Sequence, residues 1–309
     1  MDVVILNFNS FDDTTRLVNN LIKMDKLVEN IVIVDNKSTA KNEQEKLLKY
    51  RLAMTGKNIN NKNLEVILNR SNTGYAAGNN VGLRFLASKD NKDNLVAIMN
   101  PDIDIQENQL SGLLNCHKNC EKKWGDNSIG VISPWVINKN FKGLQAWKMP
   151  NLISDVLSAS IILKKIKGDI LTYKGLKQND GVKNVDVLPG SFLLLNKTAL
   201  EKIDYLNEST FLYCEERILG YNLKKFGYIS LLDTDHYYIH EHSKTINKYV
   251  NNLQKIDYLY DSKKIYYSSA KGSKLQGSII NSLRTFSKVE NTIIHLLKVS
   301  KRKLINTIK

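Results

Sequence analysis

The sequence has few cysteines, and their number argues against a fold held together by disulfides. Among 309 residues there are three, Cys116, Cys120 and Cys214. An odd number at this low density favours a reducing compartment. Cys116 and Cys120 could share one helical face with His117 between them. A zinc site needs further ligands, and the sequence places no second ligand pair nearby, so zinc is disfavoured.

Long apolar runs are also missing, which excludes two kinds of segment. No stretch approaches the ~20 apolar residues of a membrane-spanning helix. The chain runs from Met1 directly into a short apolar strand. The basic segment and long apolar core of a signal peptide do not precede that strand, so no signal peptide is expected. These absences predict a cytoplasmic protein, either free or peripheral on the inner face of the plasma membrane.

The turn after the first apolar run, residues 7–10, lacks two glycine-rich signatures. The glycine fingerprint of dinucleotide sites is absent there, so an NAD-type site is disfavoured. A Gly- and Arg-rich phosphate loop is absent as well. That absence argues against a nucleotidyltransferase, the alternative enzyme class that couples a Rossmann-like half to an Asp-bound metal.

Acidic side chains are scarce in the last part of the chain. Residues 243–309 hold 14 Lys and Arg but 3 Asp and Glu, a balance of +11 within a total of +14. Such asymmetry is typical of a protein with an anionic surface partner, either membrane or nucleic acid. No recognised nucleic-acid-binding module accompanies these charges, so nucleic acid is not expected as a partner.

The same region has the periodicity of helices, and a basic helical extension is expected over residues 246–309. Tyr-rich residues 249–267 predict one helix. Apolar residues then recur at steps of three to four, at Ile279, Ile280, Leu283, Phe286, Val289, Ile293, Leu297 and Leu304. A basic amphipathic helix of this kind can lie on an anionic membrane surface. The alternative is a helix packed on the body with its basic face in water.

The first hundred residues alternate between short apolar runs and helical segments. Runs at residues 3–6, 31–34 and 64–68 predict buried strands. A strand, a helix and a strand within about forty residues form a βαβ unit, which implies a parallel sheet. Asp35 follows the second run, where it could accept a hydrogen bond from a base or ribose. The sequence thus predicts an α/β fold with a mostly parallel, Rossmann-like sheet flanked by helices.

A fourth apolar run, residues 95–99, ends at Asn100, Asp102 and Asp104. Side chains with oxygen atoms thus occupy every second position at the end of a buried strand. In open α/β folds, this edge of the sheet is where ligands bind. Mg²⁺ is typically held by one or two carboxylates plus substrate phosphates. The pattern predicts a metal-bridged nucleotide diphosphate. The alternative is an Asx turn, with Asp104 capping a helix that begins at Gln106.

Residues 69–82 are dense in glycine and amide side chains. Gly74 and Gly78 let the backbone approach a ligand closely, and Asn72 and Asn79 supply neutral hydrogen bonds. The alternative is a tight loop followed by a Gly-rich helix that packs on the sheet.

Four stretches in this order, residues 3–9, 31–38, 72–80 and 100–102, resemble the family 2 inverting glycosyltransferases, most of all their bacterial rhamnosyltransferase-like branch. The resemblance covers roughly residues 2–245. It implies a GT-A fold with a nucleotide-sugar-binding half, 1–104, and an acceptor-binding half, 105–245. On the donor side it implies contacts from Asn7, Asn9, Asp35, Asn72, Gly74, Asn79, Asn100 and Asp102, with Asp102 as the main metal ligand.

The resemblance also implies roles for residues of the second half. Gly190 and Ser191 would line the acceptor side of the donor pocket. Glu216 lies where the family has its general base, with Glu215 beside it, and inverting transfer needs a base to take the acceptor proton. The alternative is a helix N-terminal acidic pair favoured by the macrodipole. Two later positions depart from the family pattern, with Ile218 in place of Asp and Asn222 in place of Arg.

Two further residues complete the implied site. His240 lies where a family histidine contacts the metal or the diphosphate, and Lys244 could neutralise the leaving diphosphate. The expected protein is a glycosyltransferase that depends on Mg²⁺ or Mn²⁺ and uses a dTDP- or UDP-sugar of the rhamnose, galactose or glucose type. Its expected acceptor is a lipid-linked cell-surface polysaccharide intermediate. The alternative outside catalysis is a nucleotide-sugar-binding protein that keeps the fold without the activity.

Overall fold

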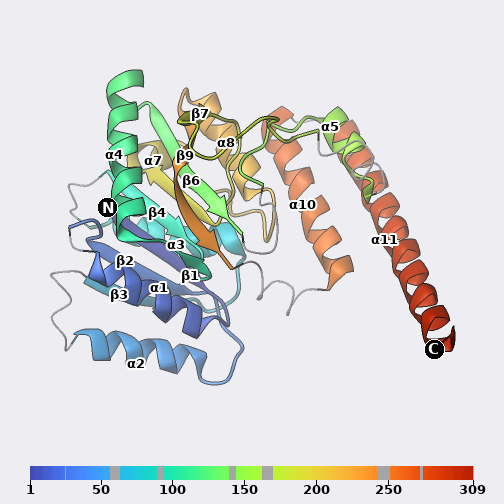
Figure 1. Ribbon diagram of the computed structural model, residues 1–309, viewed down its shortest axis with the longest axis horizontal. Coiled ribbons are helices and arrows are strands. Elements are labelled where there is room, and N and C mark those ends of the chain that lie inside the picture. The colour runs from blue at the N-terminus through green and yellow to red at the C-terminus, as the bar shows by residue number, and fades with distance from the viewer. Residues whose placement is uncertain are drawn as a thin grey trace.

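The computed structural model describes residues 1–24, 26–55, 63–89, 94–138, 144–161, 170–241, 251–271 and 274–308. Its strands are β1 (Asp2–Asn7), β2 (Asn30–Asp35), β3 (Asn63–Leu68), β4 (Leu95–Met99), β5 (Ile103–Asp104), β6 (Ile129–Ile137), β7 (Val182–Asn184), β8 (Phe192–Asn196) and β9 (Ile229–His240). Its helices are α1 (Phe11–Lys23), α2 (Glu43–Thr55), α3 (Tyr75–Ala87), α4 (Glu107–Trp124), α5 (Leu152–Leu157), α7 (Lys197–Lys202), α8 (Glu215–Lys225), α10 (Asn252–Lys271) and α11 (Lys274–Ile308). A central sheet flanked by helices, with further helices at the C-terminal end, confirms the predicted fold class (Figure 1).

The strands form one sheet that runs through both of the halves expected from the sequence. Their order is β3-β2-β1-β4-β8-β6-β9-β5, with β7 paired to β9. β1 to β4 are parallel, as predicted. Beyond β4 the directions are mixed, because β8 runs antiparallel to both β4 and β6. The carboxyl ends of β1, β2, β4 and β9 therefore share one edge of the sheet with the amino end of β8.

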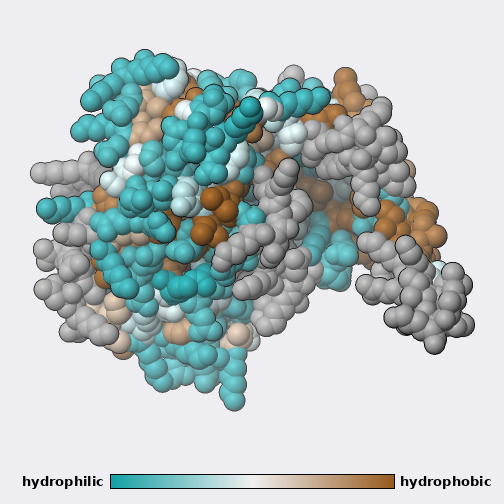
Figure 2. All heavy atoms as spheres, viewed as in Figure 1, coloured by the Kyte–Doolittle hydropathy of each residue, from teal (hydrophilic) through white to brown (hydrophobic). Residues whose placement is uncertain are grey.

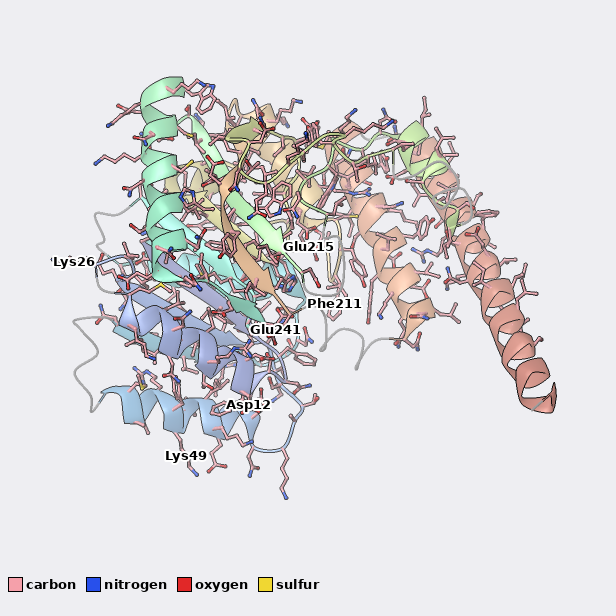
Figure 3. All side chains as sticks on the ribbon, viewed as in Figure 1. Asp12, Lys26, Lys49, Phe211, Glu215 and Glu241 are labelled. Carbon is pink, nitrogen blue, oxygen red and sulfur yellow. The ribbon has the colours of Figure 1, made fainter. Side chains whose placement is uncertain are left out.

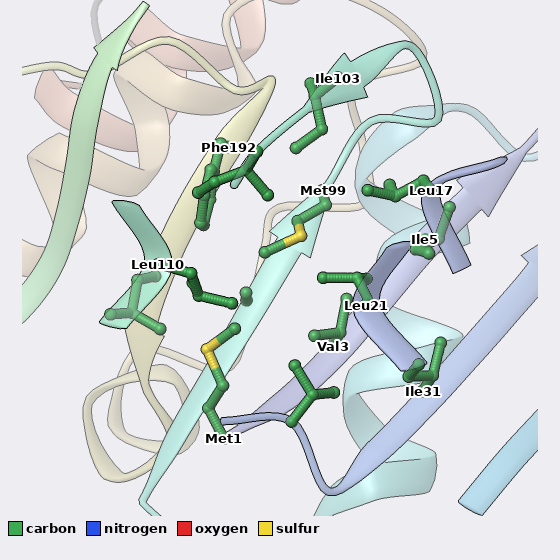
Figure 4. Packing of buried hydrophobic residues seen from close by; sticks show 14 of the residues in the cluster. Met1, Val3, Ile5, Leu17, Leu21, Ile31, Met99, Ile103, Leu110 and Phe192 are labelled. Carbon is green, nitrogen blue, oxygen red and sulfur yellow. The ribbon is translucent and has the colours of Figure 1, made fainter. Parts of the chain in front are cut away.

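Helices cover both faces of the sheet, which explains why its central strands are apolar throughout. Alternate residues of β1 point to opposite faces, so Val3 and Ile5 pack with Leu17 and Leu110 on one face. Figure 4 shows this packing at close range. Val4 points to the other face, where α3, α7 and α8 pack. Each fully buried aliphatic side chain contributes about 1.5–3 kcal/mol to the free energy of unfolding.

A third apolar cluster attaches the C-terminal helices to the body. Its members come from α8, α10 and α11 and are Ile218, Ile256, Tyr260, Tyr266, Tyr267 and Ile280. Beside this cluster, Glu290 of α11 accepts hydrogen bonds from the Ser160 hydroxyl (2.7 Å) and the Ile161 N–H (2.8 Å). Within the described residues, the helix expected over 249–267 is confirmed from Asn252 onward as α10. In the parts of the chain described above, no helix is both long and apolar enough to cross a membrane.

Gly74 makes the tightest backbone contact of the loop before α3. Its φ is +90°, and a Cβ there would overlap the backbone of Phe211. Gly175 has a similar φ, +80°, with open space around it. Both Gly74→Ala and Gly175→Ala carry the left-handed backbone cost of ~1–2 kcal/mol. Gly74→Ala must also displace a backbone segment, which adds about 1–3 kcal/mol. Urea unfolding of the two variants measures this difference, and equal losses would contradict the contact.

Candidate active site

Polar side chains gather at the sheet edge where β1, β2, β4 and β9 end. Figure 3 shows Glu241, just past the end of β9, and Glu215, at the start of α8, on the side of the sheet that faces α10. The turn after β4 lies at the same edge, because the Glu241 N–H donates to the Asp102 carbonyl (3.0 Å). The edge therefore joins residues from both halves of the chain.

The turn that follows β4 presents Asp102 to His240. The Ile103 N–H donates to the Asn100 carbonyl (3.4 Å), which closes the turn. β5 then pairs with the end of β9, which brings Asp102 Oδ1 within 3.1 Å of His240 Nε2. The turn of the alternative interpretation is thus present. Its helix cap is not, because α4 has Gln106 at its N-cap without a side-chain cap bond.

Asp102 and His240 fit a metal that is held partly by substrate. Their side chains keep 20% and 12% of their surface exposed. Within the described parts of the chain, no group of three or more His, Cys, Asp or Glu could hold an ion. Two protein ligands suit Mg²⁺ or Mn²⁺ when diphosphate oxygens supply the remaining positions.

Asp35 and Asn7 are buried and, with the half-buried Asn9, hold together the loops that follow β1 and β2. Asp35 and Asn7 are fully buried, and the Asn7 amide donates to Asp35 Oδ1 (2.9 Å). The other Asp35 oxygen accepts from Gln44 (2.6 Å) and from the Ser38 N–H (3.1 Å). Asn9 Oδ1 accepts two N–H groups from the loop after β2. Their expected contact with the donor stays a prediction, and the structure assigns them a supporting position.

The loop before α3 is organised by Asn36, a residue that the sequence did not single out. Its amide donates to Asn72 Oδ1 (2.9 Å) and to the Gly74 carbonyl (3.0 Å). Asn79 is fully buried and donates to the Tyr75 carbonyl (2.9 Å), while its Oδ1 accepts no hydrogen bond. Asn72 itself is exposed at the loop surface. The predicted Asn72, Gly74 and Asn79 therefore belong to one loop and helix start.

A line of contacts leads from the turn after β4 to the acidic pair on α8. The Asn100 N–H donates to the Ser191 carbonyl (2.9 Å), and the Ser191 hydroxyl lies 2.6 Å from the Tyr238 hydroxyl. The neighbouring Gly190 carbonyl accepts the Tyr75 hydroxyl (2.5 Å). Gly190 precedes β8, which begins at Phe192, so the expected glycine at the head of a strand lies in the turn before it. Tyr75 and Tyr238 were missed because aromatic residues carry no spacing signal for a site.

Glu215 and Glu216 begin α8 after a strained turn. Tyr213 and Cys214 both have positive φ, 74° and 64°. Non-glycine residues in this conformation each cost about 1–3 kcal/mol and cluster at functional sites. Glu216 lies against Gly190, where a Cβ would stand 2.7 Å from Glu216 Oε1. Glycine at position 190 therefore leaves the room that the Glu216 carboxyl occupies.

The two carboxyls differ in their hydrogen bonds, which separates their roles. Burial raises the pKa of Glu216, while its own N–H, the Gly190 N–H and Arg217 oppose the rise. Burial and then the Glu216 charge raise the pKa of Glu215 well above its ordinary value. Glu215 Oε1 is buried without a hydrogen-bond partner. The unpartnered oxygen of Glu215 favours its neutral form, whereas the backbone N–H groups beside Glu216 favour its charged form.

Glu215→Gln should stabilise the protein at neutral and alkaline pH. A carboxyl whose pKa is raised on folding contributes stability below its unfolded pKa and loses it as pH rises through the folded value. The glutamine has no such loss, so the difference in Tm between variant and wild type should grow with pH. At pH 8 we expect the Tm to rise by about 2 °C for each kcal/mol gained in the free energy of unfolding. At pH 4 we expect little change in Tm. A gain that is equal at both values would contradict a protonated Glu215.

Behind Glu216, a buried ion cluster ties α8 to α5 and α10. Arg217 Nη1 lies 3.0 Å from Asp155 Oδ2, and Lys263 Nζ lies 2.9 Å from Asp155 Oδ1. The Tyr267 hydroxyl also donates to Asp155 (2.7 Å). Burial alone would raise the pKa of Asp155, but Arg217 and Lys263 hold it below its ordinary value. This cluster was not predicted, because its members lie far apart in the sequence.

Two remaining positions from the sequence need comment. Ile218, which stands in place of the family's second acid, is buried in the cluster that α8 forms with α10 and α11. An apolar residue suits this position because a C-terminal helix covers it. Lys244, the predicted partner of the leaving diphosphate, lies outside the described residues.

Comparison with known proteins gives a match to a family model. The model of the family described as glycosyl transferase family 2 matches residues 2–203. The chain is 24% identical over 240 residues to the low-salt glycan biosynthesis hexosyltransferase Agl10 of Haloferax volcanii, which covers 76% of this chain and 66% of that protein. It thus spans just under two thirds of that relative's length.

Two solved structures share the fold. One is S. aureus TarS 1-349 in complex with UDP-GlcNAc, with a TM-score of 0.53 and 16% identity over 93% of this chain and 72% of that one. The other is GalNAc-T7 with UDP, GalNAc and Mn²⁺, with a TM-score of 0.58 and 15% identity over 94% of this chain and 54% of that one. At these identities the likeness establishes the fold alone.

Proposed function

The chain belongs to glycosyl transferase family 2, and we propose that it is an inverting hexosyltransferase in which Glu216 is the general base. The observation that carries this proposal is the line of contacts from Asn100, in the same turn as Asp102, through Ser191 and Gly190 to Glu216. The acceptor oxygen bonds to the anomeric carbon as the bond from that carbon to the diphosphate oxygen breaks. The electron pair of the broken bond leaves with the diphosphate, and the acceptor proton passes to Glu216.

Asp102 and His240 would hold Mg²⁺ or Mn²⁺ against the donor diphosphate. A bound ion would neutralise charge on that diphosphate. Ser191, through its hydroxyl contact with Tyr238, and Gly190, through Tyr75, fix the wall between this turn and Glu216. Lys244 remains a proposed partner of the leaving group on the grounds of resemblance.

The proposed donor is a dTDP- or UDP-sugar of the rhamnose, galactose or glucose type. Structures with the same fold contain UDP-GlcNAc, or UDP and Mn²⁺, which supports a nucleoside diphosphate and a divalent ion. Asn100 and the loop that carries Asn72, Gly74 and Asn79 would contact this donor, as the resemblance implies. Asn7, Asn9 and Asp35 would act through the loops that they hold. The rhamnosyltransferase-like branch remains a prediction from the sequence.

The second part of the proposal is that the protein associates with the inner face of the plasma membrane. Its acceptor there would be a lipid-linked saccharide. The support for both is an apolar stripe on α11, defined by Phe286, Val289, Ile293, Leu296 and Leu297, which are 50–65% exposed. Figure 2 shows apolar atoms at the surface over α11. Apolar residues beside a basic sequence favour an anionic bilayer. More protein should co-sediment with anionic vesicles than with neutral vesicles, and Leu297→Asp should lower that amount. Equal binding to anionic and neutral vesicles would contradict the proposed membrane association.

Donor binding and hydrolysis by the purified chain test the catalytic proposal. A panel of UDP-, dTDP- and GDP-sugars is offered with Mn²⁺, with Mg²⁺ and with a chelator. We expect one donor to bind in the presence of metal and to be hydrolysed slowly, because water can replace the acceptor. Binding without hydrolysis would favour a nucleotide-sugar-binding protein that lacks the activity. No binding under any condition would overturn the proposal.

A further inference from the structure

A cavity beside Glu216 lies between the body and the C-terminal helices. Its volume is about 430 Å³, within the ~300–1,000 Å³ range of small-molecule sites. Glu216 forms part of its wall, so a ligand in the cavity could present a hydroxyl to that carboxylate. Residues from α10 and α11 form the opposite wall. The C-terminal helices therefore complete a space that the transferase domain alone leaves open.

One part of this wall is apolar. Leu144, Leu171, Ile256 and Leu259 line it, and Trp147 adds a half-buried aromatic ring. Leu144 is 39% exposed, which places it at the mouth of the cavity. A purely polar saccharide would leave this surface without a partner. A hydrocarbon group on the ligand would bury it at a gain of roughly 25 cal/mol per Å².

Another part of the wall carries buried cations. Arg217 and Lys263 both line the cavity, and both pair with the single carboxylate of Asp155. Their side chains are 13% and 5% exposed, and that of Asp155 is fully buried. Arg217 has five N–H donors and Lys263 has three, more than their contacts with Asp155 use, so both can also donate to a further anion while Glu216 is ionised. Phosphate is a strong partner for arginine and lysine in such a position.

We propose that this cavity binds the acceptor, and that the acceptor is an amphiphile in which phosphate joins a saccharide to a hydrocarbon chain. The hydrocarbon lies on the wall of Leu144, Ile256 and Leu259, and the phosphate meets Lys263 and Arg217. The saccharide hydroxyl then reaches Glu216. The proposal rests on the proposed function, because it takes Glu216 as the base of that reaction. To the lipid-linked acceptor proposed above it adds the phosphate group and a binding place between the body and helices α10 and α11.

Calorimetric binding of decyl phosphate to the full chain tests the proposal, below the concentration at which micelles form. Decyl maltoside and inorganic phosphate are the comparison ligands. We expect decyl phosphate to bind at least tenfold more tightly than either, because only it satisfies both walls. Decyl maltoside binding as tightly as decyl phosphate would overturn the assignment of phosphate. Inorganic phosphate binding as tightly would overturn the assignment of hydrocarbon.

Variants with matched controls locate the binding. Leu259→Trp fills the cavity and should weaken decyl phosphate binding at least tenfold, whereas Leu253→Trp, on an exposed position of the same helix, should not. Lys263→Gln should weaken decyl phosphate but not decyl maltoside, and Lys264→Gln should change neither. Unchanged binding in Leu259→Trp would overturn the proposal.

A replacement variant and a measurement of donor binding complete the test. If Leu259→Trp does not fold, Leu144→Asp at the exposed mouth replaces it, with the same expected loss. Metal-dependent donor binding is measured on every variant, and it should not change. Loss of decyl phosphate binding with intact donor binding supports the cavity. Failure of donor binding in the wild type would count against the proposed function, whatever decyl phosphate does.

Discussion

Glu216→Gln is expected to lower the kcat of sugar transfer by about 10²–10⁴-fold, the usual contribution of a general base. Glutamine keeps the shape of the side chain and its place against Gly190, but it cannot take the acceptor proton. The Kd of the donor should stay the same, because the proposed donor site lies at Asp102 and His240. Burial raises the pKa of Glu216, so wild-type kcat/KM should rise with pH through that value. Steady-state kinetics across pH, with donor titrations, measure both effects.

Glu215→Gln provides the matched comparison within the acidic pair. Glu215 has a buried carboxyl oxygen without a hydrogen-bond partner, which favours the neutral form, so its loss should reduce kcat far less than that of Glu216. The reverse order of the two variants would assign the base to Glu215. Equal donor affinity in both variants would show that neither change disturbs the donor site.

Asp102→Asn is expected to weaken metal-dependent donor binding by at least ~10-fold, the smallest loss seen when groups around a bound metal are changed. The amide keeps a hydrogen-bonding oxygen beside His240 but removes the charge that holds the cation. Binding of the donor in the presence of a chelator should change little. Calorimetric titration of the donor with and without Mn²⁺ separates the two contributions.

Asp104→Asn is the control for this prediction. Asp104 lies two residues further on, in β5, where its carboxylate is exposed and accepts a hydrogen bond from Asn20 (3.3 Å). The Asp104→Asn variant should therefore bind the donor as the wild type does, with the same response to metal. If Asp102→Asn and Asp104→Asn behave alike, the metal is held elsewhere.

Much of the architecture could be predicted from short stretches. The apolar runs that form β1 to β4 are continuous in sequence, and burial on both faces leaves a strong local pattern. The polar residues that end these strands, such as Asp102, then had to meet at one edge because parallel strands share it. His240 and Glu216 came from resemblance, since neither has a local signal of its own.

What the sequence did not predict depends on contacts between distant segments. Asp155 and Arg217 are 62 positions apart, so no periodicity links them, yet they meet in the buried cluster behind the base. Asp35 has the chemistry of a ligand contact, but only the fold shows that Asn7, Ser38 and Gln44 occupy its oxygens. The sequence shows which hydrogen-bonding groups a side chain has. It does not show whether neighbouring residues in the fold already bind those groups.

The strand order also sets a sequence of events during synthesis. β4 pairs with β8, and β6 and β9 follow outward, so the sheet grows by adding strands from much later in the chain. At ~5–20 residues per second, β9 leaves the ribosome on the order of tens of seconds after β1. Until β8 arrives, the edge of β4 exposes unpaired backbone groups that could join another nascent chain. The nascent chain thus passes through an interval of aggregation risk, and the Asp102–His240 pair forms only after it ends.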